Sequence, residues 1–268
     1  MNVDILEFQE IIWQKSRELF RDMPWRANTQ PYYVLVSEIM LQQTQVDRVI
    51  PKFEAFIERF PTIHDLSQAS LAEVLQMWSG LGYNRRAKFL YEAAKKIVTE
   101  YDGVFPETQK ELMSLPGVGV NTAGALLAYS FNQPSIFIET NVRTVYFYHF
   151  FARQDAVNDT EIRAMVETTI DTEHPREWYW AIMDYGSFLK RQGIGQNNKS
   201  QHYKKQSPLK GSVREVRGQI LKFLMDTDVD EVTLRAQLNA DDRFEGALKS
   251  LQTEGLITQT AGLFHLKR

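Results

Sequence analysis

The sequence predicts an all-α domain followed by a small C-terminal module, and three observations lead to this fold class. Apolar residues recur at helical spacing in almost every segment before residue 190, where strand patterns are nearly absent. The segment 190–211 interrupts this pattern with six Lys and Arg residues, no acidic residue and many Gly, Asn, Gln and Ser residues. Three short amphipathic segments then precede an alternating stretch that turns at Ala261-Gly262, as a β-hairpin does. We therefore expect a helical domain at 1–189, a basic linker at 190–211 and a winged-helix-like domain at 212–268.

The expected helices follow one another with short connections marked by Pro or Gly. In the first, Ile5, Phe8 and Ile12 lie three and four residues apart, which is the spacing of one helical face. Before the linker the predicted helices are 4–20, 33–45, 46–59, 71–78, 86–101, 122–131, 142–151, 160–170 and 178–189. After the linker they are 213–225, 232–238 and 241–252, the last with Asp241 or Asp242 as its N-cap.

The composition excludes several kinds of chemistry. The 268 residues include no cysteine, which excludes disulfides, thiolate zinc sites, Cys-ligated iron–sulfur clusters and a cysteine nucleophile. No run of 18 apolar residues occurs and the acidic start does not resemble a signal peptide, so we expect a cytoplasmic protein without membrane contact. The net charge of −3 argues weakly against nucleic-acid binding. Taken alone, the basic linker is better explained as a solvated connector than as a strap that contacts phosphates.

The segment 115–125, LPGVGVNTAGA, opens a Gly-Val-Gly turn directly into an apolar helix. Gly117 and Gly119 allow positive φ and let a ligand approach the main chain closely. Free N–H groups at the start of the helix favour an anion. The string predicts a hairpin that binds a DNA phosphate, with a tight turn between packed helices as the alternative.

Two acidic residues stand out as candidate catalytic groups. Glu38 lies among apolar residues in the string VSEIML, and a carboxyl in such surroundings has a raised pKa and can act as a general acid. The alternative is a solvent-facing residue on an amphipathic helix. Glu139 follows an apolar run and precedes a helix, so it is either an active-site acid or a group that stabilises the helix dipole.

Five strings together resemble one family. PWR at 24–26, SEIMLQQTQV at 37–46, GLGY at 80–83, Arg86-Ala87 and LPGVG at 115–119 closely resemble the MutY adenine DNA glycosylases. These belong to the helix-hairpin-helix superfamily that includes endonuclease III, and the resemblance covers about residues 5–190. It implies a two-lobed helix-hairpin-helix DNA glycosylase fold that clamps double-stranded DNA containing a lesion or mismatch and flips the target nucleotide.

The resemblance also implies catalytic roles. Glu38 would protonate the purine as the glycosidic bond breaks and then help to activate water, while a second carboxylate stabilises the cationic sugar. Glu139 stands where the family has Asp, and Asn141 matches a family Asn beside it. Asn121 replaces the Lys whose amine attacks the sugar in bifunctional members, so we expect a monofunctional hydrolase without efficient lyase activity.

Further residues match the family's contacts to DNA and to a cation. Gln42 and Tyr83 would wedge into the minor groove, and Arg26 and Gln43 would line the base pocket or its approach. The full set of matched DNA- and substrate-binding residues is Arg26, Gln42, Gln43, Tyr83, Arg86, Gly117, Gly119 and Asn121. The resemblance also implies a sodium or potassium ion held by the carbonyls of Met113, Leu115 and Val118.

The chain departs from the family in three places. The four cysteines that hold a [4Fe–4S] cluster are absent, and the basic linker stands in their place, which makes Lys199, Lys204 and Lys205 candidate DNA contacts. A module of 57 residues, which could bind DNA or a protein, replaces a larger domain that reads 8-oxoguanine. Glu139 replaces Asp.

The sequence therefore predicts a monomeric, monofunctional base-excision DNA glycosylase that removes adenine opposite 8-oxoguanine or guanine and requires no cofactor. A glycosylase for another mispaired, deaminated or alkylated base is one alternative. A non-catalytic DNA-damage binding protein is a second. A transcription regulator that acts through the winged helix is a third, and it would leave the glycosylase strings unexplained.

Overall fold

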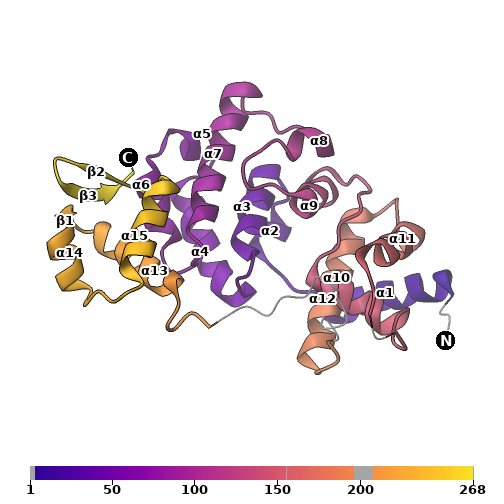
Figure 1. Cartoon of the computed structure of the whole chain (residues 1–268). Coiled ribbons are helices and arrows are strands. Elements are labelled where there is room, and N and C mark those ends of the chain that lie inside the picture. Colours follow the sequence, from indigo (N-terminus) through magenta and orange to yellow (C-terminus); the bar gives the residue numbers. More distant parts are fainter. Residues whose placement is uncertain (1–3, 155, 196–207, 268) are drawn as a thin grey trace. The chain divides into compact units, whose positions relative to one another are not determined.

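A computed structural model describes residues 4–154, 156–195 and 208–267. These residues are mostly helical, which confirms the predicted fold class (Figure 1). They divide into two compact units that alternate along the chain. The first unit is Met1–Glu38, Pro106–Ser114 and Val118–Lys205, and the second is Ile39–Phe105, Leu115–Gly117 and Gln206–Arg268. Among the described helices, none has the length and apolarity that crossing a bilayer requires.

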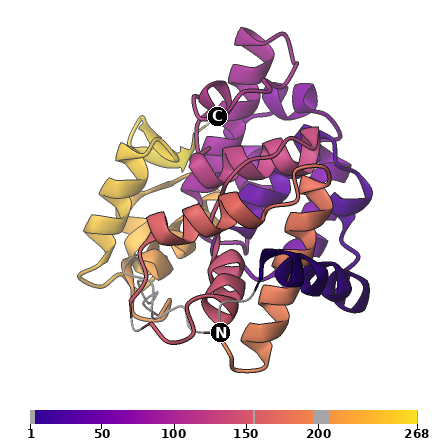
Figure 2. The ribbon, with the colours of Figure 1, turned by 90° about the vertical axis from the view of Figure 1, so that its right-hand side faces the viewer.

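The first unit is built around a long helix, α12, that receives α1 and α10 on its surface. Its helices are α1 (Ile5–Leu19), α2 (Pro24–Ala27), the larger part of α3 (Pro31–Leu41), α8 (Gln109–Leu112), α9 (Val120–Phe131), α10 (Thr140–His149), α11 (Asp159–Thr169) and α12 (Pro175–Arg191). Both α1, in indigo, and α12, in orange, lie side by side in the two views (Figures 1 and 2). Their contact is aromatic: the ring centroid of the fully buried Phe8 on α1 lies 6.0 Å from that of Trp178 on α12. The Phe8 ring also lies 4.8 Å from that of Phe150, the C-cap of α10.

In the second unit, helices α5 and α6 pack on α7. Its helical part comprises α4 (Val46–Arg59), α5 (Ile63–Gln68), α6 (Leu71–Trp78) and α7 (Arg85–Glu100). Capping boxes start α5 and α6, because Thr62 and Ser70 each accept from the N3 backbone N–H while Asp65 and Glu73 bond back to the cap. These local signals explain why two short helices begin where they do.

The rest of the second unit is the C-terminal module. It contains α13 (Val213–Leu224), β1 (Val229–Asp230), α14 (Glu231–Gln237), α15 (Phe244–Thr253), β2 (Ile257–Thr260) and β3 (Leu263–Leu266). The antiparallel strands lie in the order β1-β3-β2, and Ala261 and Gly262 both have positive φ at the tip of the hairpin. Three helices and a small sheet confirm the expected winged-helix-like module.

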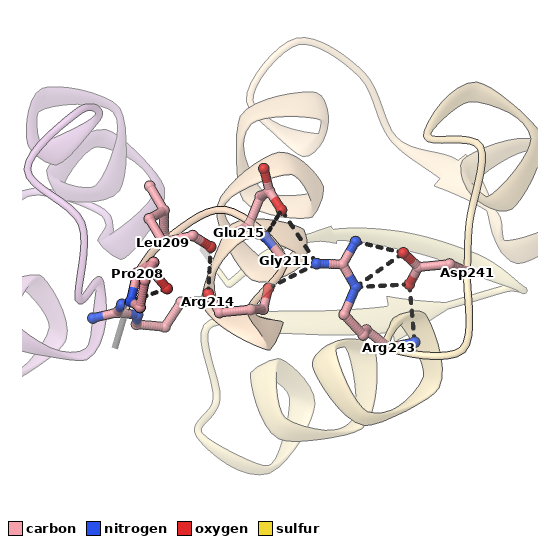
Figure 3. Close-up of polar contacts among 8 residues, drawn as sticks. Pro208, Leu209, Gly211, Arg214, Glu215, Asp241 and Arg243 are labelled. Carbon is pink, nitrogen blue, oxygen red and sulfur yellow. Dashed lines mark hydrogen bonds and ion pairs between the residues drawn. The ribbon is translucent and has the colours of Figure 1, made fainter. Parts of the chain in front are cut away.

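Helices α13 and α15 are joined by a polar network at their N-termini (Figure 3). Arg243 contacts Glu215 at 3.2 Å and donates from Nε to Asp241 Oδ2 at 2.9 Å. The predicted N-cap of α15 at Asp241 or Asp242 is wrong: Arg243 occupies that position, and Asp241 Oδ1 accepts the Arg243 backbone N–H at 2.9 Å. Arg243, a basic residue of the third helix, is therefore engaged inside the module.

Other differences from the predicted elements are local. Helix α3 ends at Leu41 instead of continuing to residue 45, and α12 runs to Arg191, two residues past the predicted domain boundary. The four-residue helices α2 and α8 and the six-residue helix α5 are too short for a periodic pattern. The division into units also cuts the predicted domain 1–189, and it groups the C-terminal module with 39–105.

Candidate active site

Glu38 lies on α3, whose sequence PYYVLVSEIML is apolar on nearly every side. Val34, Leu35, Val36 and Ile39 are buried around it, and Glu38 itself is half-buried. Desolvation by this burial, followed by the charge of Glu139, raises the pKa of Glu38 well above its usual range. Glu38 therefore keeps its proton at a higher pH than an ordinary glutamic acid, as a general acid must.

Glu139 is the N-cap of α10 and, like Glu38, belongs to the first unit. Burial raises the pKa of the Glu139 carboxyl, and the charge of Arg143, one turn further along α10, opposes this rise. Arg143 also forms an ion pair with Asp159 at 2.7 Å. Because the two glutamates interact, their protons are lost in steps that belong to the pair. The pKa of both carboxyls is raised, that of Glu38 more strongly, so Glu139 gives up its proton more readily than Glu38 does.

Tyr129 on α9 is a member of this group that sequence reasoning missed. It is buried, and its pKa is raised by desolvation first and then by the charges of Glu38 and Glu139. Its ring stacks on Trp180 with centroids 6.4 Å apart. The only signal in the sequence was one tyrosine in a helix of small apolar residues, which is also typical of an ordinary core position.

Two asparagines position the backbone around Glu139. Asn121 Nδ2 donates to the Ile138 carbonyl at 3.1 Å, and the Ile138 N–H donates to Asn121 Oδ1 at 3.2 Å. Asn141 Nδ2 donates to the Met183 carbonyl at 3.2 Å, and Lys190 Nζ donates to Asn141 Oδ1 at 3.0 Å. These contacts are to protein groups, so substrate contact by either asparagine stays a prediction. Lys190, assigned to the linker from sequence, lies in the last turn of α12.

Arg26 is buried and paired with Asp184. Its Nη1 lies 2.7 Å from Asp184 Oδ2 and its Nη2 lies 3.0 Å from Oδ1, a bidentate geometry. The guanidinium also lies 5.3 Å from the ring centroids of Phe20 and Trp180. Its donors are engaged within the protein, and its predicted place along the base pocket is untested.

Arg86, in the second unit, is buried against two loops instead of facing outward. Nη1 donates to the carbonyls of Ile39, Met40 and Gln42 at 2.7, 2.9 and 2.6 Å. Nη2 donates to the Gly82 carbonyl at 3.0 Å. Arg86 thus joins the end of α3 to the turn at 80–83. This geometry suits a positioning residue, and a direct contact of Arg86 with DNA stays a prediction.

The predicted wedge residues lie on these same loops. Gln43 and Tyr83 have positive φ, at 58° and 48°, a strained conformation for residues other than glycine. Gln42 and Tyr83 are half-buried and Gln43 is exposed. Arg214 of α13 donates to the Tyr83 hydroxyl, and its guanidinium lies 4.8 Å from the centroid of the ring. The C-terminal module therefore touches a candidate wedge residue, a contact that sequence spacing could not reveal.

The predicted phosphate-binding hairpin is the loop between α8 and α9. Gly117 has φ +77°, and a Cβ built there would lie 2.7 Å from Phe89 Cβ, so a side chain would not fit. Gly119 is the N-cap of α9 and supplies no side-chain cap to the first turn. The predicted cation at the carbonyls of Met113, Leu115 and Val118 stays a prediction. Three candidate DNA contacts lie outside the described residues: Lys199, Lys204 and Lys205.

Comparison with known proteins agrees with this fold. Residues 36–169 match the model of the HhH-GPD superfamily of base excision DNA repair proteins. The chain is 36% identical over 267 residues to an adenine DNA glycosylase of Mycolicibacterium smegmatis, covering 90% of this chain and 89% of that protein. It is 37% identical over 173 residues to one of Buchnera aphidicola, covering 63% of this chain and 48% of that protein. The chain therefore spans about half the length of this second relative.

Among solved structures, a thermostable thymine-DNA glycosylase superposes with a TM-score of 0.63 at 24% identity, over 68% of this chain and 86% of that one. At this identity the similarity supports the fold alone. With the family match and the relatives, it shows that the chain belongs to the HhH-GPD superfamily of base excision DNA repair proteins. The relatives named here are adenine DNA glycosylases, which confirms the resemblance read from the five strings.

Proposed function

We propose that the protein is a monofunctional DNA glycosylase that hydrolyses the N-glycosidic bond of adenine opposite 8-oxoguanine or guanine. The observation that carries this proposal is the pair of interacting carboxyls, in which burial and mutual repulsion keep Glu38 protonated. The names of the relatives support adenine as the base. The substrate partner is double-stranded DNA, and we expect a cytoplasmic monomer.

In the proposed mechanism Glu38 gives its proton to a ring nitrogen of the flipped purine. The bond from C1′ to the base then breaks, and adenine leaves as a neutral molecule. Positive charge develops on the sugar, where the ionised Glu139 stabilises it. Water adds to C1′ and passes its proton to the Glu38 carboxylate. This step restores the acid and leaves an abasic site.

The side chain of Asn121 supports hydrolysis without strand cleavage. The Asn121 amide cannot form a Schiff base, because it offers no basic amine, and both of its polar atoms are bonded to Ile138. The carboxylate of Glu139 is one methylene longer than the Asp of the family, and the bonds at Ile138 help to set the backbone from which it starts. This backbone placement is the feature that would compensate for the longer side chain.

Cofactor requirements follow from the donor groups. The 268 residues contain no cysteine, so they do not fit the cysteine-ligated cluster that the family implies, and no step of the proposed reaction uses one. Within the described residues, no three His, Asp or Glu side chains gather as metal ligands. We propose that base release needs no cofactor and that any sodium or potassium ion at the hairpin has a structural role.

A single-turnover panel tests the proposal. Purified protein is mixed with duplexes carrying A:8-oxoG, A:G, T:G, U:G, hypoxanthine or an alkylated base and is then treated with alkali. We expect strand breaks at A:8-oxoG and A:G, their loss in Glu38→Gln, and wild-type rates in Glu58→Gln, an exposed control on α4. Strand breaks at a different base would identify that base, in place of adenine, as the substrate. No breaks above the Glu38→Gln background would make the protein a DNA-damage binding protein.

A further inference from the structure

The second unit contains an open groove between α7 and α15, which we call the α7–α15 groove. Its volume is about 530 Å³. Arg85, Lys88 and Phe89 line it from α7, and Lys249, Ser250 and Thr253 line it from α15. Helix α15 belongs to the C-terminal module, so the groove exists only because this module packs on α7.

The charge of the α7–α15 groove is positive. Arg85 and Lys249 are exposed, and Lys88 is half-buried. The acidic side chain in the lining, Glu254, is neutralised by two bonds from Arg217, at 2.6 and 3.0 Å. Lys88 Nζ donates to the Glu254 carbonyl at 2.6 Å, at the C-terminus of α15 where the helix dipole is negative. Cationic side chains on both walls make the groove suitable for an anion.

The groove and Gly117 of the predicted hairpin share one neighbour, the side chain of Phe89. Phe89 forms part of the groove wall, and the same side chain packs against Gly117, where no Cβ would fit. The guanidinium of Arg85 lies 4.9 Å from the Phe89 ring centroid, which holds the cation at this edge. Within the second unit, the cation of Arg85 therefore lies on the α7 surface that also packs against Gly117.

We propose that the α7–α15 groove binds phosphates of the DNA backbone, with Arg85 and Lys249 as the contacts. This inference rests on the proposed DNA glycosylase function and gives the C-terminal module a part in it. The lining offers cations and small hydroxyls, so the contact positions the duplex without reading its sequence. The contact of Phe89, a wall of the groove, with Gly117 of the predicted DNA-binding hairpin favours DNA over an acidic peptide as the occupant.

The test measures binding of full-length protein to duplex DNA at several salt concentrations. The variant Arg85→Ala/Lys249→Ala removes one cation from each wall. We expect about tenfold weaker binding at low salt and a slope of log K against log salt that is smaller by about 2, whatever the duplex sequence. The control Lys95→Ala/Lys222→Ala removes two exposed lysines, one from α7 and one from the module but both outside the groove lining, and should change neither quantity.

A second measurement locates the contact. Replacing single phosphates by methylphosphonates weakens binding of the wild type wherever a phosphate is contacted, and some of these positions should lose their effect in the groove variant. Equal behaviour of the groove and control variants, or an unchanged methylphosphonate pattern, would overturn the inference and leave an acidic protein partner as the occupant to test.

The rate of base release distinguishes a failure of this inference from a failure of the proposed function. With saturating protein, the groove variant should release base at the wild-type rate. If the wild type releases no base, the proposed function fails, while the binding measurements still decide whether the groove contacts DNA.

Discussion

Asn121 and Ile138 exchange two hydrogen bonds. The side-chain amide of Asn121, on α9, pairs with the backbone N–H and C=O of Ile138, as the backbone of a neighbouring β-strand would. Ile138 directly precedes Glu139, the N-cap of α10. Asn121 thereby fixes the backbone from which Glu139, one of the two candidate catalytic carboxyls, projects. We therefore infer a positioning role for Asn121.

Loss of this pair should slow catalysis more than it weakens binding. In Asn121→Ala both hydrogen bonds disappear, and the backbone that positions the Glu139 carboxyl is no longer held in place. We therefore expect a 10- to 100-fold lower single-turnover rate with near-normal affinity for duplex DNA. Borohydride trapping gives the second readout. The wild type should form no efficient covalent adduct, and a strong adduct would contradict the hydrolytic mechanism.

The activity should depend on pH in a bell-shaped manner. The reaction needs a protonated Glu38 and an ionised Glu139, so the rate falls as pH rises through the upper apparent pKa of the pair and as pH falls through the lower. Removing the negative charge in Glu139→Gln should lower the pKa of Glu38, because the repulsion from Glu139 disappears. The basic limb of the residual activity should then move to lower pH, and a limb that stays in place would exclude coupling between the two carboxyls.

The raised pKa of Glu38 also predicts how stability changes with pH. Because the folded-state pKa lies above the unfolded value, the protonated form is favoured by folding, and this contribution is lost as pH rises through the folded pKa. Glutamine imitates the protonated acid at every pH. Glu38→Gln should therefore raise Tm at alkaline pH and leave it nearly unchanged at acidic pH, whereas the exposed control Glu58→Gln should show no such difference in thermal melts.

Arg86 should matter for folding and not for phosphate contact. Arg86→Ala leaves several buried carbonyls without a donor, and each unsatisfied group costs about 1–3 kcal/mol. Arg86→Lys retains the charge but cannot bridge both loops, so it should also lower the free energy of unfolding. In Arg86→Ala, measured under conditions where the variant is folded, the slope of log K against log salt should equal that of the wild type. A slope smaller by about 1 would instead support a direct phosphate contact.

Gly186 permits the close approach of α10 and α12. A Cβ built there would lie 2.5 Å from the Asn141 carbonyl oxygen. We expect Gly186→Ala to destabilise the protein by about 1–3 kcal/mol, as overpacking does, and to reduce base release by displacing Asn141. Gly218 in α13 is the matched control, since a Cβ there would meet nothing within 4 Å. Gly218→Ala should raise stability by about 0.5–1 kcal/mol, and urea unfolding would measure both changes.

The helices and the two carboxyls could be predicted from the sequence, because their signals lie in short continuous segments of the chain. Periodicity marks α4 and α6, and the string around Glu38 marks an acid in apolar surroundings. The directions in which the arginines point were not predictable. Arg26 and Arg86 match DNA-binding positions of the family, yet Arg26 pairs with Asp184, and the two terminal nitrogens of Arg86 donate to backbone carbonyls. The pairs with Asp184 and with Gln42 join residues more than 40 positions apart. The identity of an arginine in the sequence does not show whether its guanidinium faces water or a buried oxygen.

The packing of α1 on α12 has a consequence during synthesis. Phe8 and Trp178 are neighbours in the folded first unit but lie 170 positions apart in the chain. At about 5–20 residues per second, a ribosome needs roughly 10–30 s to make the second partner after the first. Through that interval the apolar face of α1 lacks the helix that covers it. The nascent chain is therefore expected to bind a chaperone that holds apolar segments, and to release it only once α12 has emerged.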